Sequence, residues 1–177
     1  NTPLTLLAGG ESPLRVTVES APATLAFDGV ARQFDGMQLE GQASLAIPSM
    51  AALGTWLGTP LGDRVLLGAS SISGTLSWVA ATLNLQDARV DLDGNVGEGA
   101  LTATLVDGRP SFQGTFDFAR FDAAPALAFL RSVIGPDGAW RSAPVDLPIV
   151  RAADLDLRLS AGQAVAVPGL VRVGEAE

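Results

Sequence analysis

Carboxylates are the side chains of this sequence whose spacing comes closest to a catalytic arrangement. Asp91 and Asp93 form one pair, and Asp154 and Asp156 form a second. In an extended strand the members of each pair share a face about 7 Å apart, and pairs of carboxylates hydrolyse glycosidic bonds. Both pairs alternate with valine or leucine, however, as the solvent face of a strand does, and no aromatic platform for a sugar accompanies them. We therefore interpret these residues as solvated carboxylates.

Two motifs between residues 90 and 99 resemble ligand-binding loops but fit a turn better. Residues 90–95 resemble a calcium-binding loop, yet Val96 stands where the loop needs glycine and Thr102 where it needs glutamate. Residues 94–99 are glycine-rich, but they lie between two predicted strands and not in the strand-to-helix context of a phosphate-binding loop. We predict a β-turn followed by a hairpin loop.

The residue types that are missing exclude most catalytic mechanisms. The sequence contains no lysine, histidine, cysteine or tyrosine. Without lysine there is no Schiff base, and without cysteine there is no thiolate nucleophile or zinc finger. Without histidine the usual general base and the commonest metal ligand are missing. We predict a non-enzymatic chain with no catalytic residue, metal or cofactor, and the lack of cysteine fits an oxidising envelope compartment.

The charge of the chain argues against two classes of partner. The formal net charge is −8, whereas nucleic-acid binding needs a positive footprint. The 11 arginines are scattered, so they do not form the basic patch that holds peripheral proteins on anionic lipid. No apolar run approaches the ~18 residues of a transmembrane helix. We expect no nucleic acid and no transmembrane span in this segment.

Composition and periodicity predict a β-rich fold. The 177 residues fit a single domain, 1–177, and 47% hydrophobic against 17% charged residues indicates a folded chain. Twenty glycines and eleven prolines favour many turns and short strands. Period-two alternation of apolar and polar residues is typical of strands with one buried face. We predict strands at 3–8, 14–18, 24–27, 37–47, 72–93, 100–106, 110–121 and 154–160.

Interruptions of the alternation predict two short helices and a bulge. Pro48 ends the strand 37–47, and Ser49 offers an N-cap for a helix at 50–57. A second amphipathic helix is expected at 123–134. Within 72–93 the phase of the apolar residues slips near Gln86-Asp87, which indicates a bulge or tight bend. Asp107-Gly108 is a hairpin signal.

An internal repeat links both helices to the sheet. Each copy has a long strand, a short helix, a glycine-rich loop and a return strand, and the two degenerate copies cover approximately 13–80 and 81–167. Such units bury their apolar faces by stacking. We predict a mainly β fold with two short helices. The sheet is expected to be repetitive, curved and antiparallel, either a β-groove or partly closed like a barrel, with the helices covering one side or end.

The apolar strand faces are the candidate functional feature. They form either a filled core or an open hydrophobic groove that holds acyl chains, and alternation alone does not separate the two. The residues concerned are large and apolar and lie in the second half of the chain. They are Leu83, Leu92, Leu101, Phe112, Phe116, Phe118, Leu155, Leu157 and Leu159.

The order of short motifs across residues 82–163 resembles the C-terminal region of the AsmA family of bacterial envelope proteins. In that family an amphipathic strand, a Gly-x-leucine strand, a further strand, a helix, a tryptophan, an Asp-Leu pair and a last strand follow one another. The matching pieces here are 83–90, Gly99-Ala100-Leu101, 109–114, the helix at 123–133, Trp140, Val145-Asp146-Leu147-Pro148 and 153–157. The match carries no catalytic signature.

The resemblance implies a large protein anchored in the inner membrane by an N-terminal helix, with a periplasmic β-rich body. The family is similar to bridge-like lipid-transfer proteins, whose curved sheet forms a hydrophobic groove, and its proposed role is phospholipid transport and outer-membrane assembly. This chain lacks the anchor and is too short to span the periplasm, so we expect it to be a segment of a longer protein.

Two hypotheses about function therefore stand. In the first, a periplasmic segment of an AsmA-like protein contributes to lipid handling or envelope assembly, with phospholipid acyl chains on the apolar faces. In the second, the chain is a structural or protein-binding β-domain with a dry core. Its exposed strand edges would then pair with neighbouring segments of the parent chain or with envelope proteins.

Overall fold

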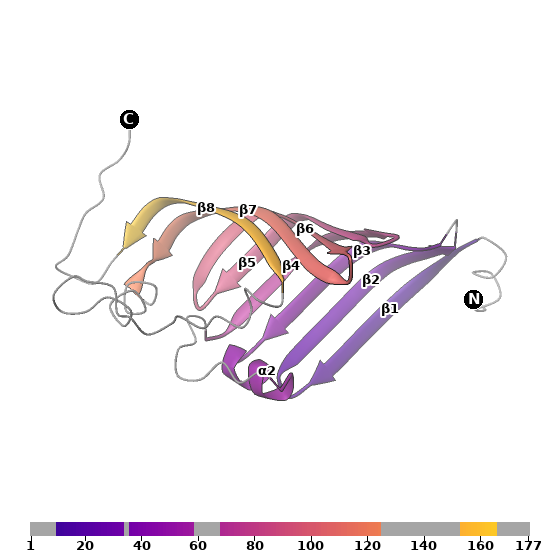
Figure 1. Cartoon of the computed structure of the whole chain (residues 1–177), viewed down its shortest axis with the longest axis horizontal. Helices are drawn as coiled ribbons and strands as arrows, with labels where there is room; N and C mark the ends of the chain where they lie inside the picture. The colour runs from indigo at the N-terminus through magenta and orange to yellow at the C-terminus, as the bar shows by residue number, and fades with distance from the viewer. Residues whose placement is uncertain (1–9, 34–35, 59–67, 125–152, 166–177) are drawn as a thin grey trace.

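A computed structural model describes residues 10–33, 36–58, 68–124 and 153–165. These residues form one eight-stranded sheet in which every strand pairs with the next along the chain, and a single short helix follows the third strand (Figure 1). The elements are β1 (Glu11–Ser20), β2 (Ala23–Gln33), β3 (Met37–Ile47), α2 (Met50–Trp56), β4 (Ser70–Val79), β5 (Thr82–Leu92), β6 (Asn95–Val106), β7 (Arg109–Asp122) and β8 (Asp154–Val165).

The sheet is antiparallel from β1 to β7, but β8 runs parallel to β7. The prediction of an antiparallel sheet is therefore wrong for its last pair. A parallel pair needs a crossover of a dozen or more residues, and the chain from 123 to 153 is long enough to return to the start of β7, where Ser111 lies opposite Asp154. The two predicted repeats therefore differ in the direction of their return strands. In the first repeat β4 is antiparallel to β3, whereas in the second β8 is parallel to β7.

The predicted helix after β3 is confirmed. Ser49 is its N-cap, and the Ser49 Oγ accepts a hydrogen bond from the backbone N–H of Ala52 at 3.2 Å. This bond satisfies a donor that the first turn leaves without a helical partner. The predicted strand 3–8 and Trp140 lie outside the described residues, and so does the helix 123–134 apart from its first two positions.

The stretch 72–93, predicted as one strand, is two strands joined by Ala80-Ala81. Alanine is not a usual turn residue, and Ala80 takes the left-handed backbone conformation with φ 53°, which explains why the turn carries no sequence signal. The predicted bulge is confirmed. The register slips between Leu85 and Ala88, and Asp87 has φ 47°.

The hairpin loop predicted at 94–99 is wrong, because β6 already begins at Asn95. Gly97 and Gly99 are strand residues that lie opposite Phe118 and Phe116 of β7. A Cβ atom on Gly97 would come within 2.7 Å of the Phe118 ring. The glycines therefore make room for aromatic rings inside the sheet and do not form a loop.

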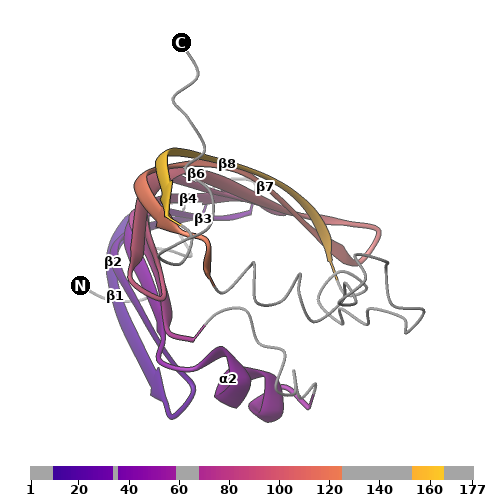
Figure 2. The same cartoon turned by 90° about the vertical axis from the view of Figure 1, so that its left-hand side faces the viewer.

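The sheet is open and strongly curved. β1 and β8 are its two edges, and α2 lies on the concave side (Figure 2). This open, curved sheet matches the predicted β-rich class. Within the described ranges no helix is long and apolar enough to cross a membrane.

Candidate functional site

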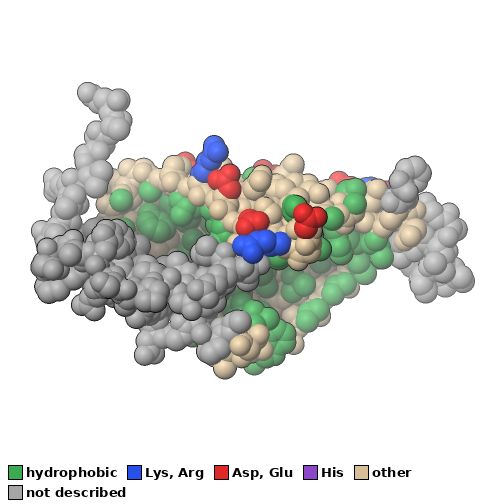
Figure 3. Space-filling model, in the orientation of Figure 1, with side chains coloured by type: hydrophobic (Ala, Val, Ile, Leu, Met, Phe, Trp, Pro, Cys, Tyr) green, Lys and Arg blue, Asp and Glu red, His purple; other side chains and the backbone are tan. Residues whose placement is uncertain are grey.

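One face of the sheet is apolar on all eight strands. Residues opposite each other in neighbouring strands share a face, so the register can be followed across the sheet. One such row contains Val18, Leu25, Leu45, Ile72, Val90, Gly97 and Phe118. We call the face that carries this row the apolar face. Hydrophobic side chains line the hollow of the curved sheet in Figure 3.

The centre of the apolar face is a closed core. Phe27 from β2 and Phe116 from β7 belong to one buried cluster with Leu76, Leu85 and Val90. Phe118 is its most enclosed large side chain, with 1% of its surface exposed. Four strands lie between β2 and β7, so the curvature of the sheet allows this cluster to form. Its buried area is the main source of stability.

The ends and one edge of the same face are open. At the end of the sheet that holds the β4–β5 and β6–β7 turns, Trp78 is 40% and Leu105 58% exposed. Along the edge strand β8, Leu155, Leu157 and Leu159 are between 43% and 55% exposed. Exposed apolar residues that share one face of a sheet mark a surface suited to a partner or an apolar ligand.

The opposite face is polar and carries the ion pairs. Arg15 and Asp28 face each other at 2.5 Å, and Arg32 contacts both Glu40, at 2.6 Å, and Glu11. These hydrogen bonds to Glu40 and Glu11 raise the pKa of the Arg32 guanidinium above its ordinary value. Exposed pairs of this kind contribute little stability. Their consequence is to make the convex face polar, opposite the apolar face.

The nine residues predicted as core or lipid-facing all belong to the apolar face, but they divide between its parts. Phe116 and Phe118 are core. Leu83, Leu92 and Leu101 are partly buried against the core cluster, and Phe112 is half-buried. The open positions are Leu155, Leu157 and Leu159.

The apolar face also contains residues that are not among the nine predicted from the sequence. Phe27 and Leu76 complete the core, and Met37, Trp78 and Leu105 add exposed apolar surface at one end of the sheet. The alternation in 37–47 already placed Met37 on the apolar side. The position of Trp78 at the end of a strand is not evident from the sequence, because the turn at Ala80-Ala81 divides a stretch predicted as one strand.

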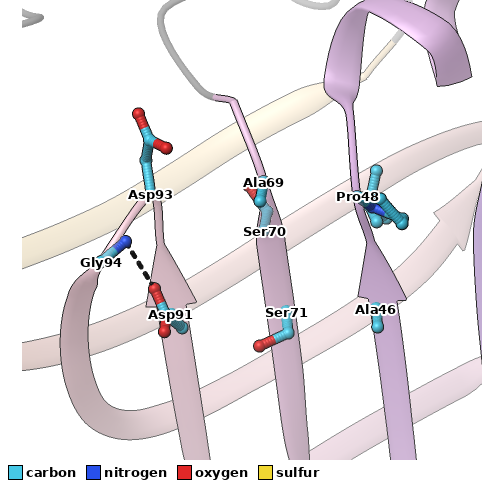
Figure 4. Close-up of a pocket in the computed structure, with 9 residues that line it drawn as sticks. Ala46, Pro48, Ala69, Ser70, Ser71, Asp91, Asp93 and Gly94 are labelled. Carbon is cyan, nitrogen blue, oxygen red and sulfur yellow. Dashed lines mark hydrogen bonds between the residues drawn. The ribbon is translucent and has the colours of Figure 1, made fainter.

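The paired carboxylates do not form a convergent dyad. Asp91 accepts a hydrogen bond from the backbone N–H of Gly94 at 2.7 Å, which closes the β5–β6 turn. Asp93 points away from Asp91 at the mouth of a shallow pocket of about 280 Å³ (Figure 4). Asp154 binds the Arg109 guanidinium at 2.8 Å. Asp91 and Asp154 therefore each have a structural partner, and Asp93 does not converge with Asp91.

No three acidic side chains of the described residues are grouped so that they could hold a metal ion. Comparison of the chain with protein-family models, curated proteins and solved structures finds no match.

Proposed function

We propose that this chain is a non-enzymatic, periplasmic segment of an AsmA-like protein that holds phospholipid acyl chains on the apolar face of its curved sheet. Its role would be in phospholipid transport or outer-membrane assembly, with the parent protein anchored to the inner membrane by a region outside this segment. The observation that supports the proposal is the set of large apolar side chains that stay exposed on the concave face. An acyl chain laid along them would remove that surface from water.

The proposal assigns different tasks to the parts of the apolar face. The buried cluster around Phe116 and Phe118 holds the sheet in its curve. The exposed side chains at Trp78, Leu105 and the leucines of β8 contact lipid. The convex face, with its ion pairs, stays in water.

Two adjacent residues on opposite faces provide a matched test. Leu105 on the apolar face is 58% exposed and Val106 on the polar face is 55% exposed, so glutamate should be tolerated at both by the fold. Lipid bound to the chain purified from bacterial periplasm would be counted by native mass spectrometry. We expect Leu105→Glu to lower binding roughly tenfold or more, because its charge would enter an apolar environment, and Val106→Glu to leave it unchanged. Equal loss in both variants, or no lipid on the unchanged chain, would contradict the proposal.

A dry scaffold is the second candidate, and the buried core favours it. The centre of the face is filled by the chain's own side chains, with Phe27 and Phe116 in one cluster. In this case the exposed leucines would contact protein, and both glutamate variants would behave like the unchanged chain in the lipid measurement.

A further inference from the structure

Among the described residues, no strand pairs with the outer edge of β8. β8 is the last strand of the sheet, and its only neighbour in the described residues is β7. Eleven of its twelve residues are exposed, and only Val165 is half-buried. The strand contains no proline and no charge on its apolar side, so it lacks the usual protection against pairing with another strand. An edge of this length can accept a further strand.

Only some of the polar side chains of β8 bind side chains of its neighbour β7. Asp154 binds Arg109 at 2.8 Å, and the Ser160 hydroxyl donates to Asp117 at 3.0 Å. Asp156 and Arg158 instead face the neutral residues Gln113 and Thr115. Among the described residues, the ion pair of Asp156 and Arg158 is with each other, at 3.9 Å and with both side chains largely exposed. Opposite charges therefore stand two positions apart on the open edge.

We propose that β8 pairs antiparallel with β8 of a second copy about a two-fold axis through Leu157. With this register Asp156 of one copy lies opposite Arg158 of the other, and the same pair recurs on the other side of the axis. On the apolar face Leu155 lies opposite Leu159, and Leu157 opposite itself. Opposite charges and matched apolar residues in cross-strand positions stabilise an antiparallel pair, and a two-fold axis requires a self-complementary edge of this kind.

The other edge of the sheet is less suited to such pairing. β1 contains Pro13, and proline in an edge strand removes a backbone donor from the side that would bond to an incoming strand. Of the two edges formed by the described strands, β8 is the one that lacks a proline. Pairing through β8 also closes the dimer, whereas a contact of β1 with β8 would continue from copy to copy.

A two-fold axis perpendicular to the sheet leaves both apolar faces on the same side. The dimer would thus join two concave apolar faces into one continuous surface across the paired β8 strands. The dimer does not depend on lipid binding, so the two proposals can fail separately.

Charge exchange on the β8 edge tests the register. The mass of the chain in solution would be measured by sedimentation equilibrium for the unchanged chain, Asp156→Arg, Arg158→Asp and the double exchange. We expect a dimer for the unchanged chain. Each single exchange should weaken the association of the two copies roughly tenfold or more, because like charges then lie opposite each other. The double exchange restores opposite charges and should restore the dimer. A monomeric unchanged chain, or single exchanges that leave the dimer intact, would overturn the proposal.

A cysteine at the axis gives an independent readout. The chain has no cysteine, so Leu157→Cys introduces one thiol per copy, and in the proposed register the two thiols face each other within disulfide reach. We expect mild oxidation to give a covalent dimer from Leu157→Cys. Leu105→Cys, on the same face and similarly exposed but in β6 and away from the β8 edge, should form no covalent dimer under the same conditions. Equal cross-linking of both variants would show random collision and overturn the assignment.

Discussion

At the scale of single residues, the core of the sheet depends on phenylalanines that pack opposite glycines in the neighbouring strand. Gly97 lies opposite Phe118, and Gly99 lies opposite Phe116. Both phenylalanines are buried, with Phe118 only 1% exposed. An added Cβ would come within 2.7 Å of the Phe118 ring at Gly97 and would overlap the Thr115 carbonyl oxygen at Gly99. These strand glycines are therefore needed for packing and not for backbone flexibility.

We predict that Gly97→Ala destabilises the chain by about 1–3 kcal/mol, the usual cost of overpacking a core. The added Cβ would lie 2.7 Å from the Phe118 ring. Urea unfolding followed by far-UV circular dichroism measures the change. Gly162→Ala on the exposed strand β8 is the control, since its nearest neighbour would be 3.2 Å away. A loss at Gly97 no larger than that at Gly162 would show that the ring can move aside.

At the scale of elements, the hairpins explain which features of the fold could be read from the sequence. Strict alternation located β3 at its observed bounds, and Asp107-Gly108 located the β6–β7 turn. Ala80-Ala81 gives no turn signal in the sequence, because alanine has no turn preference. The direction of β8 depends on where the preceding connection returns to the sheet, and alternation within a strand carries no information on direction.

The β4–β5 turn carries local backbone strain that a substitution should remove. Ala80 has φ 53° while Ala81 does not have a positive φ, and a two-residue hairpin turn of this pattern prefers glycine at its first position. We predict that Ala80→Gly stabilises the chain by about 0.5–1 kcal/mol, because the left-handed conformation costs a residue with a Cβ more than it costs glycine. Thermal unfolding measures the shift, and Ala81→Gly should not raise the stability. A lower midpoint for Ala80→Gly would contradict this account of the turn.

The sequence predicts which residues lie on the apolar face, but it does not predict which of them are exposed to solvent. Phe116 and Leu159 are opposite each other in neighbouring strands and share the apolar face. Phe116 is 6% and Leu159 55% exposed. The difference arises because Phe116 lies within the curve of the sheet and Leu159 on its edge strand, and both properties depend on contacts between residues far apart in the chain.

At the scale of the whole molecule, the open curved sheet separates a polar convex face from an apolar concave face. Its core is large enough to fix the curve, and exposed apolar residues remain at the ends and along β8. The concave face thus has a buried core at its centre and exposed apolar residues around it. This arrangement fits the proposal that an apolar ligand lies along the concave face while water contacts the convex face. We propose that lipid binds on the concave face only.

Trp78 permits the most direct test of that claim. With Trp56 and Trp140 changed to phenylalanine, Trp78 is the sole tryptophan, and it lies on the apolar face with its indole N–H donated to the Ala80 carbonyl at 2.9 Å. Brominated acyl chains quench a tryptophan that they touch. The matched control moves the tryptophan to the polar face by Trp78→Leu with Val79→Trp. We predict strong quenching of Trp78 by bound brominated phospholipid and little quenching of the control, whereas equal quenching of both, or of neither, would contradict a lipid site on the concave face.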